Sequence, residues 1–134
     1  MNWDDYISFS KEEFDCKCDS CGGSNKMDEH FISRLQDLRD RCGFPFRITS
    51  GYRCPQHPIE AAKKEAGRLS AHSTGLACDI AVSGANAFAL IKHATDLHFL
   101  GIGVAQKGDA GSRFIHIDMC EANKGFPRPW VWSY

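Results

Sequence analysis

The sequence has no long apolar run and no excess of charge of one sign. None of its apolar stretches approaches the roughly 20 residues that a helix needs to cross a bilayer. The 134 residues carry a formal net charge of −1, so there is no broad basic field of the kind that attracts nucleic acid or anionic membranes. We therefore expect neither a membrane nor a nucleic acid as a partner.

Repeats, low-complexity segments and a secretory signal are also absent. The first residues, MNWDDYISFSKEEF, are acidic and lack a basic region followed by an apolar stretch. We expect the chain to be made in the cytoplasm without a signal peptide, and to need another route to any site outside it. The length fits one compact domain over residues 1–134, and we expect a monomer.

The cysteine count is odd. With seven cysteines, at least one thiol stays unpaired unless chains are cross-linked. Together with the missing signal, this favours reduced thiols or metal ligation over a disulfide framework. Cys42, Cys78 and Cys120 lie in apolar patterns and are expected to be small core residues.

Apolar periodicity predicts an α+β fold. A capping box at Ser10 starts a short helix, and apolar spacings of four, three and four indicate a helix over 27–42. Further helices are predicted at 59–66 and 85–97, and strands at 46–50, 76–82, 101–105 and 114–119. We predict a single domain with a small, mostly antiparallel sheet and helices packed on it. The aromatic end, FPRPWVWSY, is expected to pack back over the body.

Three residues are candidate metal ligands: His72, Asp79 and His116. His72 precedes the strand that carries Asp79, and small residues at Gly75 and Ala77 let the intervening loop fold back tightly. His116 lies on a neighbouring strand, and a catalytic zinc uses three protein ligands and leaves a fourth position for water. Each residue also has an ordinary role, because a single histidine is usually a surface or hydrogen-bonded residue and a strand aspartate is often a cap.

Longer motifs around these residues resemble a known enzyme family. SAHSTGLACD matches the Ser-x-His-x-x-Gly-x-Ala-x-Asp signature of peptidase family M15, the zinc D,D-carboxypeptidases and murein endopeptidases. It also resembles the metal site of the Hedgehog signalling domain. ITSGYRCPQHP is similar to the upstream Ser-Gly-Tyr-Arg segment of the family, FIHID to its late strand, and RPWVWSY to the ending of many phage-encoded members.

The resemblance implies a Hedgehog/DD-peptidase-like fold and a zinc ion (Zn2+) held by His72, Asp79 and His116. It also implies that Arg53 binds the substrate carbonyl or the developing oxyanion, and that Ser70 supports the substrate-binding site. Zinc would polarise the scissile carbonyl, and Arg53 would stabilise charge that appears in the transition state. Without the family, Arg53 has an alternative interpretation as a turn residue in a surface salt bridge.

The general base is where the sequence departs from the better-known members. They often place a glutamate or a histidine two to six residues before the last zinc histidine, and here that window is AGSRFI. Asp118, on the same strand face as His116, is the nearest carboxylate. It either accepts a proton during catalysis or orients His116. Asp109, in a glycine-rich loop, is the outside alternative.

A second group of metal-ligand residues lies near the N-terminus. Cys16, Cys18 and Cys21 fall within six residues, and Cys54-x-x-His57 follows later. A Cys-x-x-Cys pair with a distant Cys-x-x-His has the spacing of a structural zinc site. Against it stand the tight Cys16-x-Cys18 pair and the overlap with the Ser-Gly-Tyr-Arg segment. A zinc site, free thiols and one disulfide all remain open.

The favoured hypothesis is a zinc peptidase, phage- or prophage-encoded, that cuts the stem peptides of bacterial cell-wall peptidoglycan as a carboxypeptidase or an endopeptidase. It would act on the wall after release or as part of a phage particle. The main alternative is a non-catalytic zinc-binding module that kept the metal site and lost the base. A cysteine-based zinc ribbon for nucleic acid is disfavoured by the near-zero net charge.

Overall fold

A five-stranded sheet forms the centre of the molecule. The computed structural model describes residues 1–134. The strands are β1 (Arg47–Ser50), β2 (Ala77–Ala81), β3 (Gly101–Ala105), β4 (Phe114–Asp118) and β5 (Trp130–Ser133), in the order β1-β2-β4-β3-β5. All neighbouring pairs are antiparallel except β3 and β5, which are parallel. The prediction of an α+β fold with a small, mostly antiparallel sheet is confirmed.

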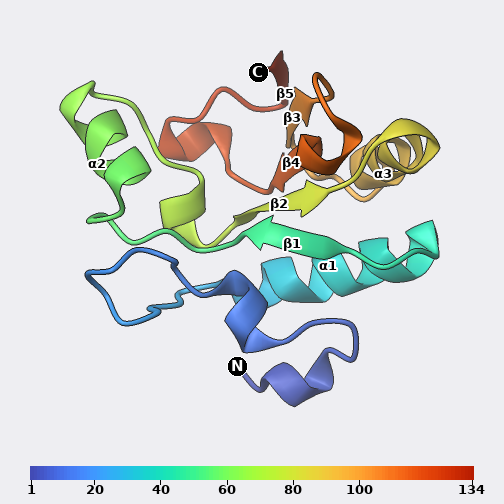
Figure 1. Ribbon diagram of the computed structural model, residues 1–134, viewed down its shortest axis with the longest axis horizontal. Coiled ribbons are helices and arrows are strands. Elements are labelled where there is room, and N and C mark those ends of the chain that lie inside the picture. The colour runs from blue at the N-terminus through green and yellow to red at the C-terminus, as the bar shows by residue number, and fades with distance from the viewer.

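Three helices accompany the sheet: α1 (Glu29–Cys42), α2 (Pro58–Glu65) and α3 (Gly84–Asp96). Helix α1 begins where the carboxylate of Asp28 accepts from the N–H of Phe31, and it ends at Gly43 in the left-handed conformation. In Figure 1, α3 and α2 lie at opposite ends of the molecule, and α1 runs beside β1. None of the helices has the length and apolar character that a bilayer crossing requires.

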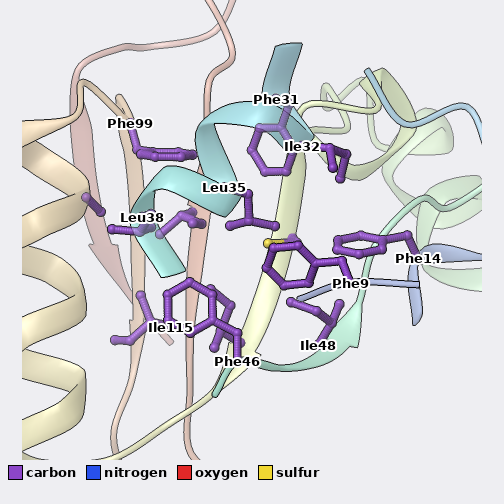
Figure 2. Packing of buried hydrophobic residues seen from close by; sticks show 14 of the residues in the cluster. Phe9, Phe14, Phe31, Ile32, Leu35, Leu38, Phe46, Ile48, Phe99 and Ile115 are labelled. Carbon is purple, nitrogen blue, oxygen red and sulfur yellow. The ribbon is translucent and has the colours of Figure 1, made fainter. Parts of the chain in front are cut away.

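One face of the sheet packs against α1 and α3. Alternate residues of the strands, including Ile48, Ile80 and Ile115, join one core with Leu35 and Leu38 of α1. Figure 2 shows Ile48, Ile115, Leu35 and Leu38 together with Phe9 and Phe14, which bring the N-terminal segment into the same core. Because side chains alternate along a strand, the intervening residues of β2 and β4 point to the opposite face, where the candidate site lies.

The aromatic tail adds a strand. Residues 130–133 form β5, which pairs with β3 in register from Gly101 with Trp130 to Val104 with Ser133. The tail therefore packs back over the body as expected, but as the edge of the sheet. Trp130 at the start of this edge strand keeps 57% of its surface exposed, so its side chain is only partly packed against the body.

Two glycines of β3 make room for bulky neighbours on the face away from α1 and α3. A Cβ at Gly101 would overlap with the carboxylate of Asp118, and a Cβ at Gly103 would lie 2.8 Å from Nε1 of Trp132. Both are close approaches that a larger residue would prevent. The GIGVA segment thus has glycines where its neighbouring strands place large side chains.

The first prediction concerns Gly101. We expect Gly101→Ala to lower the free energy of unfolding by about 1–3 kcal/mol, because the new methyl group would displace a fully buried carboxylate. Chemical denaturation monitored by circular dichroism measures the change. Gly111→Ala is the matched control, since a Cβ there meets nothing within 4 Å. Equal stability of the two variants would contradict the prediction.

Candidate metal centre

The three predicted ligands come together on the sheet face opposite α1 and α3. Asp79 in β2 and His116 in β4 are direct cross-strand partners, and His116 Nδ1 lies 3.0 Å from Asp79 Oδ1. His72, in a short 3-10 helix before β2, places Nε2 3.4 Å from the same oxygen. All three side chains are buried, and their donor atoms lie within 4.8 Å of one another. Three donor atoms this close together could hold a single metal ion.

The loop between His72 and Asp79 turns back through Gly75. This glycine has φ +78°, and a Cβ there would overlap with the backbone carbonyl of Lys26. The N–H of Asp28 donates to the carbonyl of Gly75 at 3.0 Å, and this hydrogen bond links the loop to the start of α1. Ala77 follows and is fully buried. The small residues in the motif therefore let the loop fold back tightly, as the sequence predicted.

Hydrogen bonds orient both histidine rings. His72 Nδ1 donates to the carbonyl of Gly51 at 2.8 Å, and His116 Nε2 donates to Asp118 Oδ2 at 2.7 Å. The remaining ring nitrogens both face Asp79 Oδ1. Lone pairs that converge in this way repel one another unless a cation lies between them, and the cation is either an additional proton on a histidine or a metal ion.

Electrostatic interactions keep Asp79 ionised and favour protonation of His116 in the absence of metal. Burial alone would raise the pKa of Asp79, but hydrogen bonds with His116 and His72 outweigh it and lower that pKa. Burial alone would lower the pKa of His116, and the carboxylates of Asp118 and Asp79 raise it instead. A metal ion at this centre would therefore displace a proton from His116.

Asp118 is fully buried and has no free oxygen. Arg128 donates to it from Nε at 2.8 Å and from Nη2 at 2.7 Å, and the N–H of Cys120 donates at 3.2 Å. Burial raises the pKa of this carboxyl, but the hydrogen bonds from His116 and Arg128 outweigh it and lower the pKa to about 2. The structure thus brings Asp118 to His116, as predicted, but outside the lining of the cleft described below.

Arg53 lies beside the metal-ligand side chains. Its Nη2 is 3.6 Å from Asp79 Oδ2 and its Nη1 is 3.3 Å from Glu60 Oε1, and its side chain is only 15% exposed. It is therefore not a turn residue in a surface salt bridge. Ser70 plays an indirect part: its hydroxyl accepts from the N–H of Ser73, whose own hydroxyl donates to the carbonyl of Arg53.

A cleft of about 750 Å³ opens above the three predicted ligands. Its cationic lining residues are Arg53, Lys63, Arg68 and Arg128, and its aromatic ones are Phe114, Phe126, Trp130, Trp132 and Tyr134. Asp79 is the only carboxylate in the lining, because Glu60 lies behind Arg53 and Asp109 is exposed elsewhere. Ser70 is not part of the wall either.

Sequence reasoning missed several residues of this cleft. Arg128 contacts the aromatic rings of Phe126 and Trp132, with its guanidinium carbon 5.4 and 5.1 Å from their centroids. An arginine inside an otherwise aromatic tail was the available signal. No sequence signal pointed to Lys63, or to Glu60 behind Arg53, because a glutamate three residues before a lysine is the ordinary pattern of a solvated helix.

The N-terminal cysteines converge without His57. Cys16, Cys18, Cys21 and Cys54 form a second group with metal-ligand geometry, and all seven cysteines of the chain are free thiols. The suggested Cys54-x-x-His57 ligand pair is therefore wrong. His57 is the N-cap of α2 instead, and its Nδ1 accepts from the N–H of Ile59 at 3.2 Å.

Comparison with known proteins places the chain in a family. The model of the family described as Peptidase M15 matches residues 7–118, a range that contains Arg53 and all three predicted ligands. No curated protein matches the chain significantly. Because the family match covers most of its length, this chain belongs to peptidase family M15, a family of metallopeptidases.

Proposed function

We propose that the protein is a zinc-dependent peptidase that hydrolyses peptide bonds in the stem peptides of bacterial peptidoglycan. The observation that carries the proposal is the convergence of His72, Asp79 and His116 under a basic cleft, with Arg53 beside them. Membership of the M15 family supports the metallopeptidase chemistry. The cleft supports the substrate class.

The donor set fits zinc. Two imidazole nitrogens and one carboxylate oxygen are typical zinc ligands, and three protein ligands characterise a catalytic site. In this proposal His72 binds through Nε2, His116 through Nδ1 and Asp79 through Oδ1, the atoms that already face one another. Zinc bound there supplies Lewis-acid polarisation of the scissile carbonyl and a nucleophile at neutral pH.

Arg53 has the position of an oxyanion-stabilising residue. Its guanidinium lines the cleft next to Asp79, and Glu60 holds it from behind. A preorganised cation in a partly buried site stabilises negative charge on the carbonyl oxygen more effectively than it would in water. Ser70, assigned to substrate binding by resemblance, acts in this proposal through Ser73 on the backbone of Arg53.

The charge of the cleft favours a peptide rich in carboxylates. Four of its lining residues are cationic and one is acidic, although the whole chain has a net charge of −1. A cleft with one sign of charge concentrates ligands of the other sign. Stem peptides carry several free carboxylates, so we propose that these meet Lys63, Arg68 and Arg128. With that substrate, we propose that the protein acts at the bacterial wall, after release or on a phage particle.

Asp118 acts in this proposal as a positioning residue. Its two oxygens already accept from His116, Arg128 and the backbone of Cys120, and the side chain has no exposed surface. A carboxylate that accepts from the far nitrogen of a metal-binding histidine fixes the orientation and tautomer of the ring. A proton acceptor for the nucleophile would have to reach the cleft, which Asp118 does not.

A non-catalytic zinc-binding module is the second candidate function. It is favoured by the lining of the cleft, which holds no carboxylate besides the predicted ligand Asp79. Such a module would bind zinc and stem peptides and leave the peptides intact. The two functions separate in one experiment, because only the peptidase creates new amino groups.

The second prediction tests the peptidase itself. Incubation of the zinc-loaded protein with purified peptidoglycan should release new amino groups, and mass spectrometry of defined muropeptides should identify the bond that is cut. His116→Ala should abolish the release because one of the three donors is lost. His30→Ala, an exposed histidine of α1, is the matched control. A folded, zinc-loaded wild type that releases nothing would favour the binding module.

The third prediction concerns Arg53. Arg53→Ala should lower turnover by about 100-fold while the zinc content stays unchanged, because the lost cation acts on the transition state and not on the metal. Steady-state kinetics and metal analysis measure the two effects. Arg47→Ala, an exposed arginine of β1, serves as the control. Unchanged turnover in a folded Arg53 variant would assign the residue a structural role.

The fourth prediction separates the two roles considered for Asp118. Asp118→Asn should weaken zinc binding by about 10–100-fold, because the amide holds the His116 ring less well. At saturating zinc most of the turnover should return. A variant with normal zinc affinity and almost no turnover would instead identify Asp118 as the general base. Thermal melting of each variant checks that the loss of the Arg128 ion pair has not unfolded the chain.

A further inference from the structure

Four cysteine side chains point at one another between the N-terminal loop and the segment after β1. The Sγ of Cys18 lies 3.6 Å from that of Cys16, 3.4 Å from that of Cys21 and 3.3 Å from that of Cys54. All four sulfur atoms lie within 4.8 Å of one another. The cluster is separate from the cleft, because none of the four residues lines it.

These sulfur–sulfur distances are too long for disulfide bonds and are close to those between sulfur ligands of one metal ion. A disulfide holds its sulfur atoms about 2.05 Å apart. Four thiolates placed tetrahedrally at about 2.3 Å from zinc are about 3.8 Å from one another. Thiols are weak hydrogen-bond partners, so direct contacts between them explain little of the convergence. The N–H of Cys54 also donates to Cys16 Sγ at 3.3 Å, a contact that strengthens when the sulfur is a thiolate.

The loop that carries three of these cysteines has little else to hold it. Residues 15–28 contain no helix or strand, and from 17 to 24 no side chain is buried. Gly22 and Gly23 have φ of 65° and 82°, and the N–H of Cys16 donates to the carbonyl of Ser24 at 2.8 Å, which closes the loop. Apart from Cys16, the closed loop places no buried residue in the core, which is typical of segments that a structural metal ion orders.

We propose that Cys16, Cys18, Cys21 and Cys54 bind a structural zinc ion, distinct from the metal at His72. The four sulfur ligands complete a tetrahedral shell and leave no position for water or substrate, so this zinc has no catalytic role. Binding releases the thiol protons and couples the ion to folding of the loop. The proposal does not depend on the peptidase activity.

The zinc would hold the segment that builds the other centre. Cys54 directly follows Arg53, and the carbonyl of Gly51 accepts from His72. Within the same segment, the N–H of Tyr52 donates at 2.9 Å to the carbonyl of Phe14, two residues before Cys16. A Cβ at Gly51 would lie 2.6 Å from the Cα of Phe14, so the two backbones are in direct contact. The cluster thus joins the segment around Phe14 and Cys16 to residues 51–54, at the point where the two segments pack together.

The fifth prediction is a metal count, because the chain has two separate donor groups. Protein purified with zinc should contain two zinc ions per chain, Cys18→Ser and His116→Ala one each, and the double variant none. Cys42→Ser, outside the cluster, is the matched control and should keep both. A Cys18→Ser protein that stays folded and keeps both zinc ions would overturn the proposal.

Cobalt(II) substitution decides the question even if Cys18→Ser does not fold. In His116→Ala, cobalt should give the sulfur-to-metal charge-transfer absorption of a thiolate site, because the four cysteines are the donor group that stays complete. A folded His116→Ala protein without that absorption would overturn the proposal. Failure of the peptidase is distinguishable, because an inactive protein that binds two zinc ions contradicts the proposed activity and supports the cysteine site.

Discussion

The cross-strand pair of Asp79 and His116 is the constraint on which the rest of the site depends. These residues face each other in the antiparallel ladder of β2 and β4, so the backbone alone brings a carboxylate and an imidazole within 3.0 Å. A shift of the pairing by one residue would turn His116 into the core and Ile115 toward the cleft. The same register that fills the core with isoleucines therefore sets the spacing of the predicted ligands.

Burial of so much charge behind this pair is possible because every charge has a partner. Asp118 has no exposed surface, and Arg128 neutralises it through two hydrogen bonds while His116 occupies the remaining side. An unpaired carboxylate at this depth would be strongly destabilising. The glycine opposite it in β3 completes the arrangement by leaving space for the paired group. Neutrality and close packing thus act together behind the candidate metal centre.

The local elements and the three predicted ligands were accessible from the sequence because each depends on a short pattern. Period-two alternation in FIHID and the small residues after His72 encode geometry within a few positions. The parallel pairing of β5 and the place of Arg128 depend on which distant segments meet, and no local period encodes that. The same holds for the cysteine cluster, in which Cys16 and not His57 joins the other three cysteines. Which residue becomes the fourth member depends on how the N-terminal loop folds.

The parallel edge strand has a consequence for how the cleft wall of this chain can change. The predicted ligands are complete by residue 116 and the family match ends at 118, whereas much of the aromatic wall of the cleft comes from residues 126–134. Most of the aromatic part of the wall thus follows the predicted ligands along the chain, whereas Lys63 and Arg68 of the same wall precede all three of them. Exposed tail positions such as Trp130 can exchange without disturbing the donors. Arg128 and Trp132 contact Asp118 and His116, so these two tail positions are tied to both the wall and the donors.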